Sequence, residues 1–131
     1  MSDLILGTGE GPQVVLGDGA QVAVPSGQDV RFLDMVLNAP GNEGLPIRFR
    51  FVAPAIAKDG GAIDYDTATV DMEHLCNSFV LPKIAAMSPV PTQVVISFSA
   101  TEVPFGETAP EVTQFFEAYR VEGGACIWEA F

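Results

Sequence analysis

One segment of this chain has the apolar spacing of an amphipathic helix, and the segments on either side of it have the patterns of strands. In DTATVDMEHLCNSF (66–79), apolar side chains recur at the i, i+3, i+4 and i+7 positions of one helix face: Met72, Leu75, Cys76 and Phe79. Asp66 or Thr67 suits the N-terminal cap of this helix. Pro82 lacks an N–H and clashes with the preceding turn, so we expect the helix to kink or restart there, with 83–87 as a last short turn.

The clearest strand is LPIRFRFVA (45–53), in which apolar and cationic side chains alternate. The apolar side chains fall on one face, and Arg48 and Arg50 fall on the other. Further strands are expected before and after it, at 13–16, 20–24, 29–37 and 93–99. Asp18-Gly19 lies between the first two of these, and its preference for positive φ predicts a hairpin turn that joins them.

The segment after Pro110 fits two patterns. Four apolar side chains have helical spacing, and Pro110 suits a first helical turn: Val112, Phe115, Phe116 and Tyr119. However, the segment is rich in aromatic residues, and Gly123-Gly124 and the β-prone ACIW follow it. We favour a hairpin of 113–121 with 125–130.

The resulting order of strands and helix predicts an α+β fold, with an antiparallel β-sheet and one main helix packed on one face. At 131 residues the chain is long enough to bury a core of its own. We therefore expect a single α+β domain over 13–131. The glycine-rich residues 1–12 are too poor in apolar side chains to pack, and we interpret them as a flexible N-terminal arm.

The charge of the chain excludes some partners. Its 17 Asp+Glu outnumber its 6 Lys+Arg, which gives a formal net charge of −11. No nucleic acid is expected as a partner, because binding it requires clustered Lys and Arg, and an anionic membrane would repel the chain. No apolar run approaches the roughly 20 residues of a membrane-spanning helix, so we expect a soluble protein without a transmembrane segment.

The two cysteines leave one possible intramolecular pairing, with only the oxidation state open. Cys76 lies on the apolar edge of the expected helix, and Cys126 lies on the last strand. If the helix packs on the sheet, a disulfide between them would hold the C-terminal strand against the helix. The alternatives are two buried thiols in the core and, less in keeping with the spacing, a metal or catalytic role. We favour the disulfide.

Three polar residues of the helix invite a catalytic interpretation, since Asp71, His74 and Ser78 share one face. A Ser-His-Asp triad also needs a nucleophile on a strained turn and an oxyanion hole, and no G-x-S-x-G context is present. We interpret these residues as a solvated polar face, and we predict no catalytic residue.

Four acidic residues near the start of the helix suggest a calcium site: Asp59, Asp64, Asp66 and Asp71. They do not match the D-x-D-x-D-G loop, and Asp near a helix N-terminus is expected from the helix dipole alone. The glycines of GTGEGP precede a strand and make no phosphate-binding loop. We therefore expect no metal and no cofactor.

Arg48 and Arg50 project from one strand face of a chain with few cations. They either pair with acidic side chains on neighbouring strands or form a small patch that binds an anion or a partner. The second interpretation would combine them with the Pro- and Gly-rich loop VPFGETAPE (103–111).

Residues 24–131 resemble a family of small alphaproteobacterial proteins that is catalogued only as a domain of unknown function. The resemblance rests on PFGE (104–107), on QFFEAYR (114–120), and on Cys76 together with CIWE (126–129). Members of that family look like exported proteins with a signal peptide ahead of this region. The family brings no established activity with it.

The resemblance implies a periplasmic protein whose signal peptide has been removed and which carries an added Met1. It also favours the disulfide, because thiols oxidise in that compartment. Our leading hypothesis is a non-enzymatic interaction or accessory domain with a protein partner. The alternative is a small-ligand binder or enzyme whose site is built from the 103–111 loop with Arg48 and Arg50.

Overall fold

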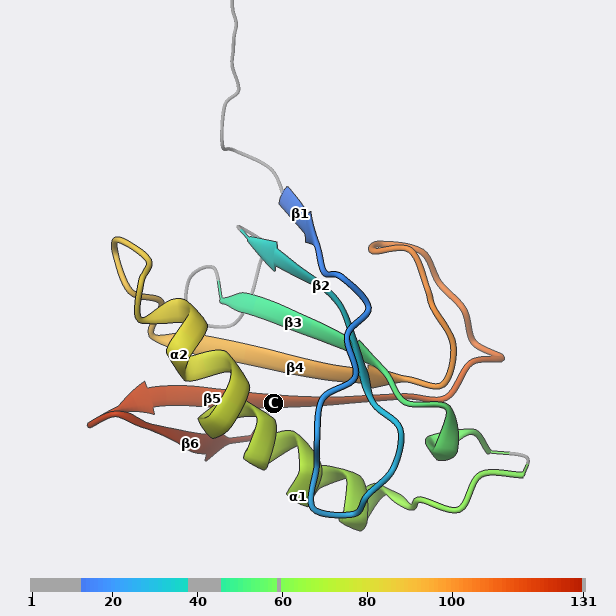
Figure 1. Ribbon diagram of the computed structural model, residues 1–131. Coiled ribbons are helices and arrows are strands. Elements are labelled where there is room, and N and C mark those ends of the chain that lie inside the picture. The colour runs from blue at the N-terminus through green and yellow to red at the C-terminus, as the bar shows by residue number, and fades with distance from the viewer. Residues whose placement is uncertain (1–12, 38–45, 59, 131) are drawn as a thin grey trace, which may run out of the picture.

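The chain forms one six-stranded sheet in which each strand lies beside the next in sequence, as Figure 1 shows. The computed structural model describes residues 13–37, 46–58 and 60–130. The strands follow the chain in this order: β1 (Gln13–Leu16), β2 (Arg31–Leu37), β3 (Ile47–Val52), β4 (Gln93–Ser99), β5 (Gln114–Glu122) and β6 (Ala125–Glu129).

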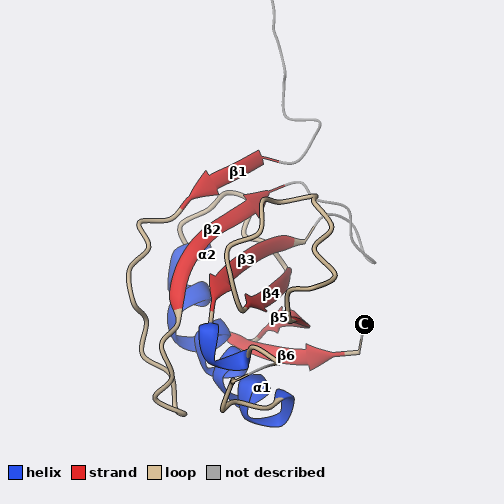
Figure 2. Ribbon diagram, turned by 90° about the vertical axis from the view of Figure 1, so that its right-hand side faces the viewer, coloured by secondary structure: helices blue, strands red, loops and turns tan. Residues whose placement is uncertain are grey.

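A single helical layer covers one face of this sheet (Figures 1 and 2). It consists of α1 (Tyr65–Leu75), a π-helical turn η2 (Cys76–Val80) and α2 (Leu81–Ile84), which follow one another without a gap. A short 3₁₀ turn, η1 (Pro54–Ile56), precedes it. The predicted α+β fold is confirmed. Within the described residues, no helix is long and apolar enough to cross a membrane.

The sheet is mixed, although four of its five strand pairs are antiparallel. The exception is the pair β3 and β4, which run parallel with Ile47 opposite Val94 and Val52 opposite Ser99. The helical layer connects these two strands, and a crossover of this kind returns the chain to the end of the sheet from which it left. The sequence prediction of an antiparallel sheet missed this one pair.

The core lies between the helical layer and the sheet. From the strands it takes the apolar side chains that alternate with polar ones, including Phe49, Phe51, Ile96 and Phe98. From the helices it takes the predicted apolar face, of which Met72, Leu75 and Cys76 are buried. Phe79 is partly buried, and its ring centroid lies 5.1 Å from that of Phe32 and 5.7 Å from that of Phe51. Such edge-to-face aromatic pairs add to the stability from buried apolar area.

The predicted hairpin of 13–16 with 20–24 is wrong, because β1 pairs with β2. The chain after β1 continues alongside β2: the Gly17 N–H donates to the Leu33 carbonyl (2.8 Å) and the Val22 N–H to the Val30 carbonyl (2.9 Å). Of 20–24, only Gln21 forms an isolated bridge to the sheet. The chain turns back later, at 24–28, where the Gly27 N–H donates to the Val24 carbonyl.

Asp18-Gly19 interrupts the regular pairing of the segment after β1 with β2 and does not form a hairpin turn. Gly19 has the expected positive φ of 72°, and the Asp18 carboxylate accepts from the Ala20 N–H (2.9 Å). Gly17 is required for a different reason, since a Cβ there would lie 2.6 Å from the Phe32 ring. The positive φ expected at Gly19 is therefore present, but the chain does not reverse its direction there.

The N-cap of the helix lies two residues before the first of the expected positions. Asp64, not Asp66 or Thr67, is the N-cap, and its carboxylate accepts from the Thr67 N–H (2.9 Å). The interruption expected at Pro82 takes the form of the π-helical turn just before it. There the Leu81 N–H donates to the Cys76 carbonyl, five residues back. A wider turn at this point suits a proline, which offers no N–H and crowds the preceding turn.

The C-terminal segment forms the predicted hairpin of β5 with β6, and the helical alternative is excluded. Gly123 and Gly124 make its turn with φ of 62° and 78°, a conformation that other residues rarely adopt. Trp128 lies opposite Tyr119, and Cys126 lies opposite Val121.

A disulfide joins Cys76 at the start of η2 to Cys126 on β6, with their Cα atoms 6.1 Å apart. This is the pairing favoured from the sequence. Next to it, the Cys126 N–H donates to the Asn77 side-chain oxygen (3.1 Å). The hairpin is thus attached to the helix by one covalent bond and one hydrogen bond at the same place.

Replacing both cysteines by serine is expected to lower the free energy of unfolding by about 4 kcal/mol, the loop-entropy value for a closed loop of this length. Urea unfolding followed by circular dichroism measures the change. Reductant should destabilise the native protein by a similar amount and leave the Cys76→Ser/Cys126→Ser variant unaffected. Equal stability of the two proteins in non-reducing buffer would contradict the role assigned to the bond.

Candidate functional site

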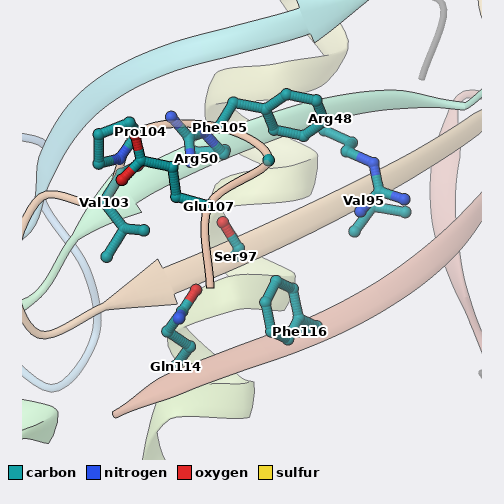
Figure 3. Close-up of a pocket in the computed structure, with 11 residues that line it drawn as sticks. Arg48, Arg50, Val95, Ser97, Val103, Pro104, Phe105, Glu107, Gln114 and Phe116 are labelled. Atoms are coloured by element: carbon teal, nitrogen blue, oxygen red, sulfur yellow. Dashed lines mark hydrogen bonds between the residues drawn. The ribbon is translucent and has the colours of Figure 1, made fainter. Parts of the chain in front are cut away.

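Among the hollows of the described structure, two lie on opposite faces of the sheet. The first, which we call the outer hollow, lies on the face away from the helices and beneath the loop that follows β4 (Figure 3). Its volume is about 160 Å³. It is lined by Arg48, Arg50, Val95, Ser97, Val103, Pro104, Phe105, Gly106, Glu107, Gln114 and Phe116.

The sheet register brings the strand residues of the outer hollow together. Arg50 lies beside Ser97 on β4, and Ser97 lies beside Phe116 on β5. Because alternate residues of a strand share a face, Arg48 lies on the same side as Arg50. The structure thus brings the predicted arginine pair and the first part of the 103–111 loop to one place.

Arg50 is engaged by the protein itself. Its guanidinium makes a two-pronged contact with the carboxylate of Asp34 on β2, at 2.7 and 2.8 Å. It also donates to the Val103 carbonyl (2.8 Å), and it lies 5.5 Å from the centroid of the Phe105 ring. The two charged side chains are only 14% and 4% exposed. Arg50 therefore holds the loop onto the sheet, and its charge is balanced by Asp34.

Arg48 also lines the outer hollow. Burial lowers the pKa of its guanidinium from the ordinary value, although arginine remains charged at neutral pH. The hollow as a whole is smaller than the roughly 300–1,000 Å³ of typical small-molecule pockets. An anion or partner site at Arg48 and Arg50 stays a prediction.

The second hollow lies on the helix side, between α1 and the C-terminal hairpin, and we call it the α1–hairpin groove. Its volume is about 350 Å³. It is lined by Tyr65, Thr69, Val70, Glu73, Glu117, Tyr119 and Trp128. This set of residues was not predicted from the sequence.

Each wall of the α1–hairpin groove follows from local structure. Tyr65, Thr69 and Glu73 recur every four residues and so lie along one face of α1. On the opposite wall, Glu117 and Tyr119 alternate along one face of β5. Trp128 on β6 lies directly opposite Tyr119 in the register, which places its side chain on that face too.

Glu117 is the buried acid of the groove, with only 3% of its surface exposed. The Tyr65 hydroxyl donates to one of its carboxylate oxygens, and the Trp128 indole N–H donates to the other. The Tyr65 ring also packs edge-on against Phe115, with centroids 5.1 Å apart. One carboxylate thus links a residue of the helix to a residue of the last strand.

The groove has a negative electrostatic field. Burial raises the pKa of the Tyr119 phenol, and the charges of Glu117 and then Glu73 raise it further. At its mouth the groove is apolar and open: Trp128 is 60% exposed and Val70 is 55% exposed. The groove therefore combines exposed aromatic and aliphatic surface with a buried negative charge.

The suspected triad does not form a site. Asp71 is fully buried, which corrects its assignment to a solvated face, while His74 and Ser78 are exposed. The Asp71 carboxylate accepts three hydrogen bonds from the turn at 24–28: from the Ser26 N–H (3.0 Å), the Ser26 hydroxyl (2.5 Å) and the Gln28 side-chain amide (2.8 Å). Asp71 therefore fixes that turn to the helix.

The acidic residues near the helix start have separate roles. Asp64 caps the helix, Asp66 lies in its first turn, and Asp71 binds the 24–28 turn. Asp59 lies outside the described residues. Among the residues that are described, no three His, Cys, Asp or Glu side chains gather closely enough to hold a metal ion.

A sequence signal for Glu117 exists, although it is weak. In β5 the inward positions read Phe115, Glu117, Tyr119 and Val121, so one acid interrupts an apolar alternation. A charge at an inward position is rare unless it has partners. Tyr65 lies 52 residues away from Glu117 in the chain, and no local pattern connects the two.

The model of a family described as "Family of unknown function (DUF6497)" matches residues 9–131 of the chain. The chain belongs to this family. The DUF6497 match includes the helix, every strand of the sheet and both hollows. Comparison with curated proteins and comparison with solved structures each give no significant match.

We expect Asp71→Asn to lower the free energy of unfolding by about 1–3 kcal/mol, because an amide replaces a carboxylate that accepts from three part-buried donors. Glu102→Gln is the matched control, since it makes the same change of charge at an exposed position. Urea unfolding at neutral pH measures both. Equal effects of the two substitutions would contradict the structural role of Asp71.

Asp34→Ala is expected to lower the free energy of unfolding by about 3–5 kcal/mol, because it leaves the Arg50 charge buried without its partner. Removing the second charge in Asp34→Ala/Arg50→Met should recover part of this loss. Asp29→Ala is the control, since Asp29 pairs with Arg31 at the surface and should change stability by under about 1 kcal/mol. A double variant less stable than Asp34→Ala would contradict the pairing.

Proposed function

We propose that this chain is a non-enzymatic binding domain that acts outside the cytoplasm and docks a protein partner in the α1–hairpin groove. The observation that carries the proposal is the position of Trp128. Its indole N–H is held by buried Glu117, while 60% of its surface is left exposed. Tryptophan fixed in this way is a typical anchor of protein interfaces.

The surroundings of Trp128 support an interface. Tyr65 and Val70 are also exposed at this groove. Exposed apolar side chains are common singly, but a cluster around one hollow is typical of a binding surface. The disulfide and the hydrogen bond from Cys126 to Asn77 fix the two walls of the groove before a partner arrives. A preformed site costs less conformational entropy on binding.

The disulfide also supports a location in an oxidising compartment, since such bonds rarely persist in the reducing cytoplasm. The resemblance to exported alphaproteobacterial proteins points to the periplasm and to a signal peptide that has been removed. The partner is then a protein of that compartment.

A role without catalysis is supported by how the chain uses its reactive side chains. Asp71 holds a turn, and Arg50 and Asp34 hold the loop after β4. His74 and Ser78 lie on the exposed side of the helix without a nucleophile–base pair among the described hydrogen bonds.

Photo-crosslinking in the host periplasm tests the proposal. A photoreactive residue in place of Val70 at the groove should give a discrete protein adduct, which Trp128→Ala should abolish. The same residue in place of Val90, which is 47% exposed and does not line the groove, should give none. No adduct at position 70, or adducts at both positions that persist in Trp128→Ala, would contradict docking in the groove.

A further inference from the structure

The charge of Glu117 lacks a cation in the described structure. Its carboxylate is 3% exposed, and its two hydrogen-bond donors, the Tyr65 hydroxyl and the Trp128 indole, are neutral. The corresponding acid on the other face of the sheet is Asp34, which is 3% exposed and has the Arg50 guanidinium at 2.7 Å. Buried carboxylates are costly unless they are paired, so a cation that enters the groove would be stabilised by the charge of Glu117.

We propose that the α1–hairpin groove binds an alkylammonium group, which is the side chain of a lysine of the docked partner. The inference rests on the function proposed above for the same groove and names the chemistry of what enters it. The ammonium lies among the rings of Tyr65 and Trp128, with the Glu117 charge at the base of the groove and the Glu73 charge on the α1 wall.

The composition of the groove selects for a cation. It contains two carboxylates and three aromatic rings, and no basic side chain is among its lining residues. Aromatic rings attract cations through their quadrupole, an attraction that grows when the cation is partly desolvated. The net charge of −11 adds a long-range attraction for positively charged ligands and repels anions.

The groove suits an alkylammonium better than a metal ion. Calcium requires six to eight oxygen ligands, whereas the carboxylates here come from Glu117 and Glu73 alone. An alkylammonium needs one or two acceptors for its N–H groups and an apolar wall for its methylenes. The carboxylate of Glu117 can accept about four hydrogen bonds and uses two, while Val70 and the aromatic rings supply the wall.

The fluorescence of Trp128 provides a direct readout, because it is the single tryptophan of the chain. Titration of the disulfide-bonded protein with n-butylammonium chloride should give a saturable change in emission. n-Butanol, which has the same chain without the charge, and sodium chloride at equal ionic strength should give none. Added salt should weaken the binding of the amine, because partly exposed charges are screened.

Variants separate a charge effect from a packing effect. Glu117→Gln keeps the shape of the side chain and should weaken n-butylammonium binding about tenfold or more, as expected when a buried counter-charge is lost. Glu73→Gln at the exposed wall should weaken it by a smaller factor without loss of folding. Glu102 does not line the groove, so Glu102→Gln should leave the binding of n-butylammonium unchanged. Thermal unfolding of each variant identifies any that fails to fold, and Glu73→Gln then carries the comparison.

Two peptides distinguish the sources of the ammonium group. If acetyl-Gly-Lys-Gly-amide saturates the signal and its norleucine counterpart does not, the lysine side chain is the ligand. If n-butylammonium binds and the lysine peptide does not, the site is one for small amines. Absence of saturable binding by either probe, or equal binding by butanol, would overturn the proposal.

The outcome is separable from that of the crosslinking experiment. A partner that crosslinks at position 70 while no amine binds would leave the docking function standing and remove the ammonium site. Amine binding that depends on Glu117, with no protein adduct, would keep the ammonium site and remove the protein partner.

Discussion

The candidate site of this structure depends on the attachment of the C-terminal hairpin to the helix. β6 is an edge strand of five residues, and β5 is its one neighbour in the sheet. The Cys76–Cys126 bond and the Asn77 hydrogen bond add a second support from the helical layer. Because the helix carries one wall of the α1–hairpin groove and the hairpin carries the other, the same attachment sets the width of the groove. Stability and the candidate site thus depend on one cross-link.

Much of the fold is predictable because its signals are local. The apolar spacing of Met72, Leu75 and Cys76 fixes the buried face of the helix, and Gly123-Gly124 fixes the last hairpin. The error at 13–24 arose because Asp18-Gly19 has the chemistry of a hairpin turn whether or not the chain reverses there. What decides the outcome is the continued pairing of that segment with β2, and such a pairing depends on residues remote in the chain.

The candidate site was less predictable than the fold for the same reason. Arg48 and Arg50 were identified because they share one strand, and their hollow is closed by a loop that follows β4. Tyr65, Glu117 and Trp128 come from three elements, and only the packing of α1 against the hairpin brings them together. Asp71 shows the converse. It has the pattern of a solvated helix residue, yet a turn more than 40 positions away supplies three donors and buries it.

Two buried acids on opposite faces of the sheet, Asp34 and Glu117, have partners of different charge. Asp34 pairs with a cation of its own chain, Arg50, which holds a loop that lines the outer hollow. Glu117 meets two neutral donors whose rings border an open groove. Hydrogen bonds from neutral donors stabilise a carboxylate without cancelling its charge. The negative charge of Glu117 can therefore attract a cationic ligand in the groove, whereas the charge of Asp34 is balanced by Arg50.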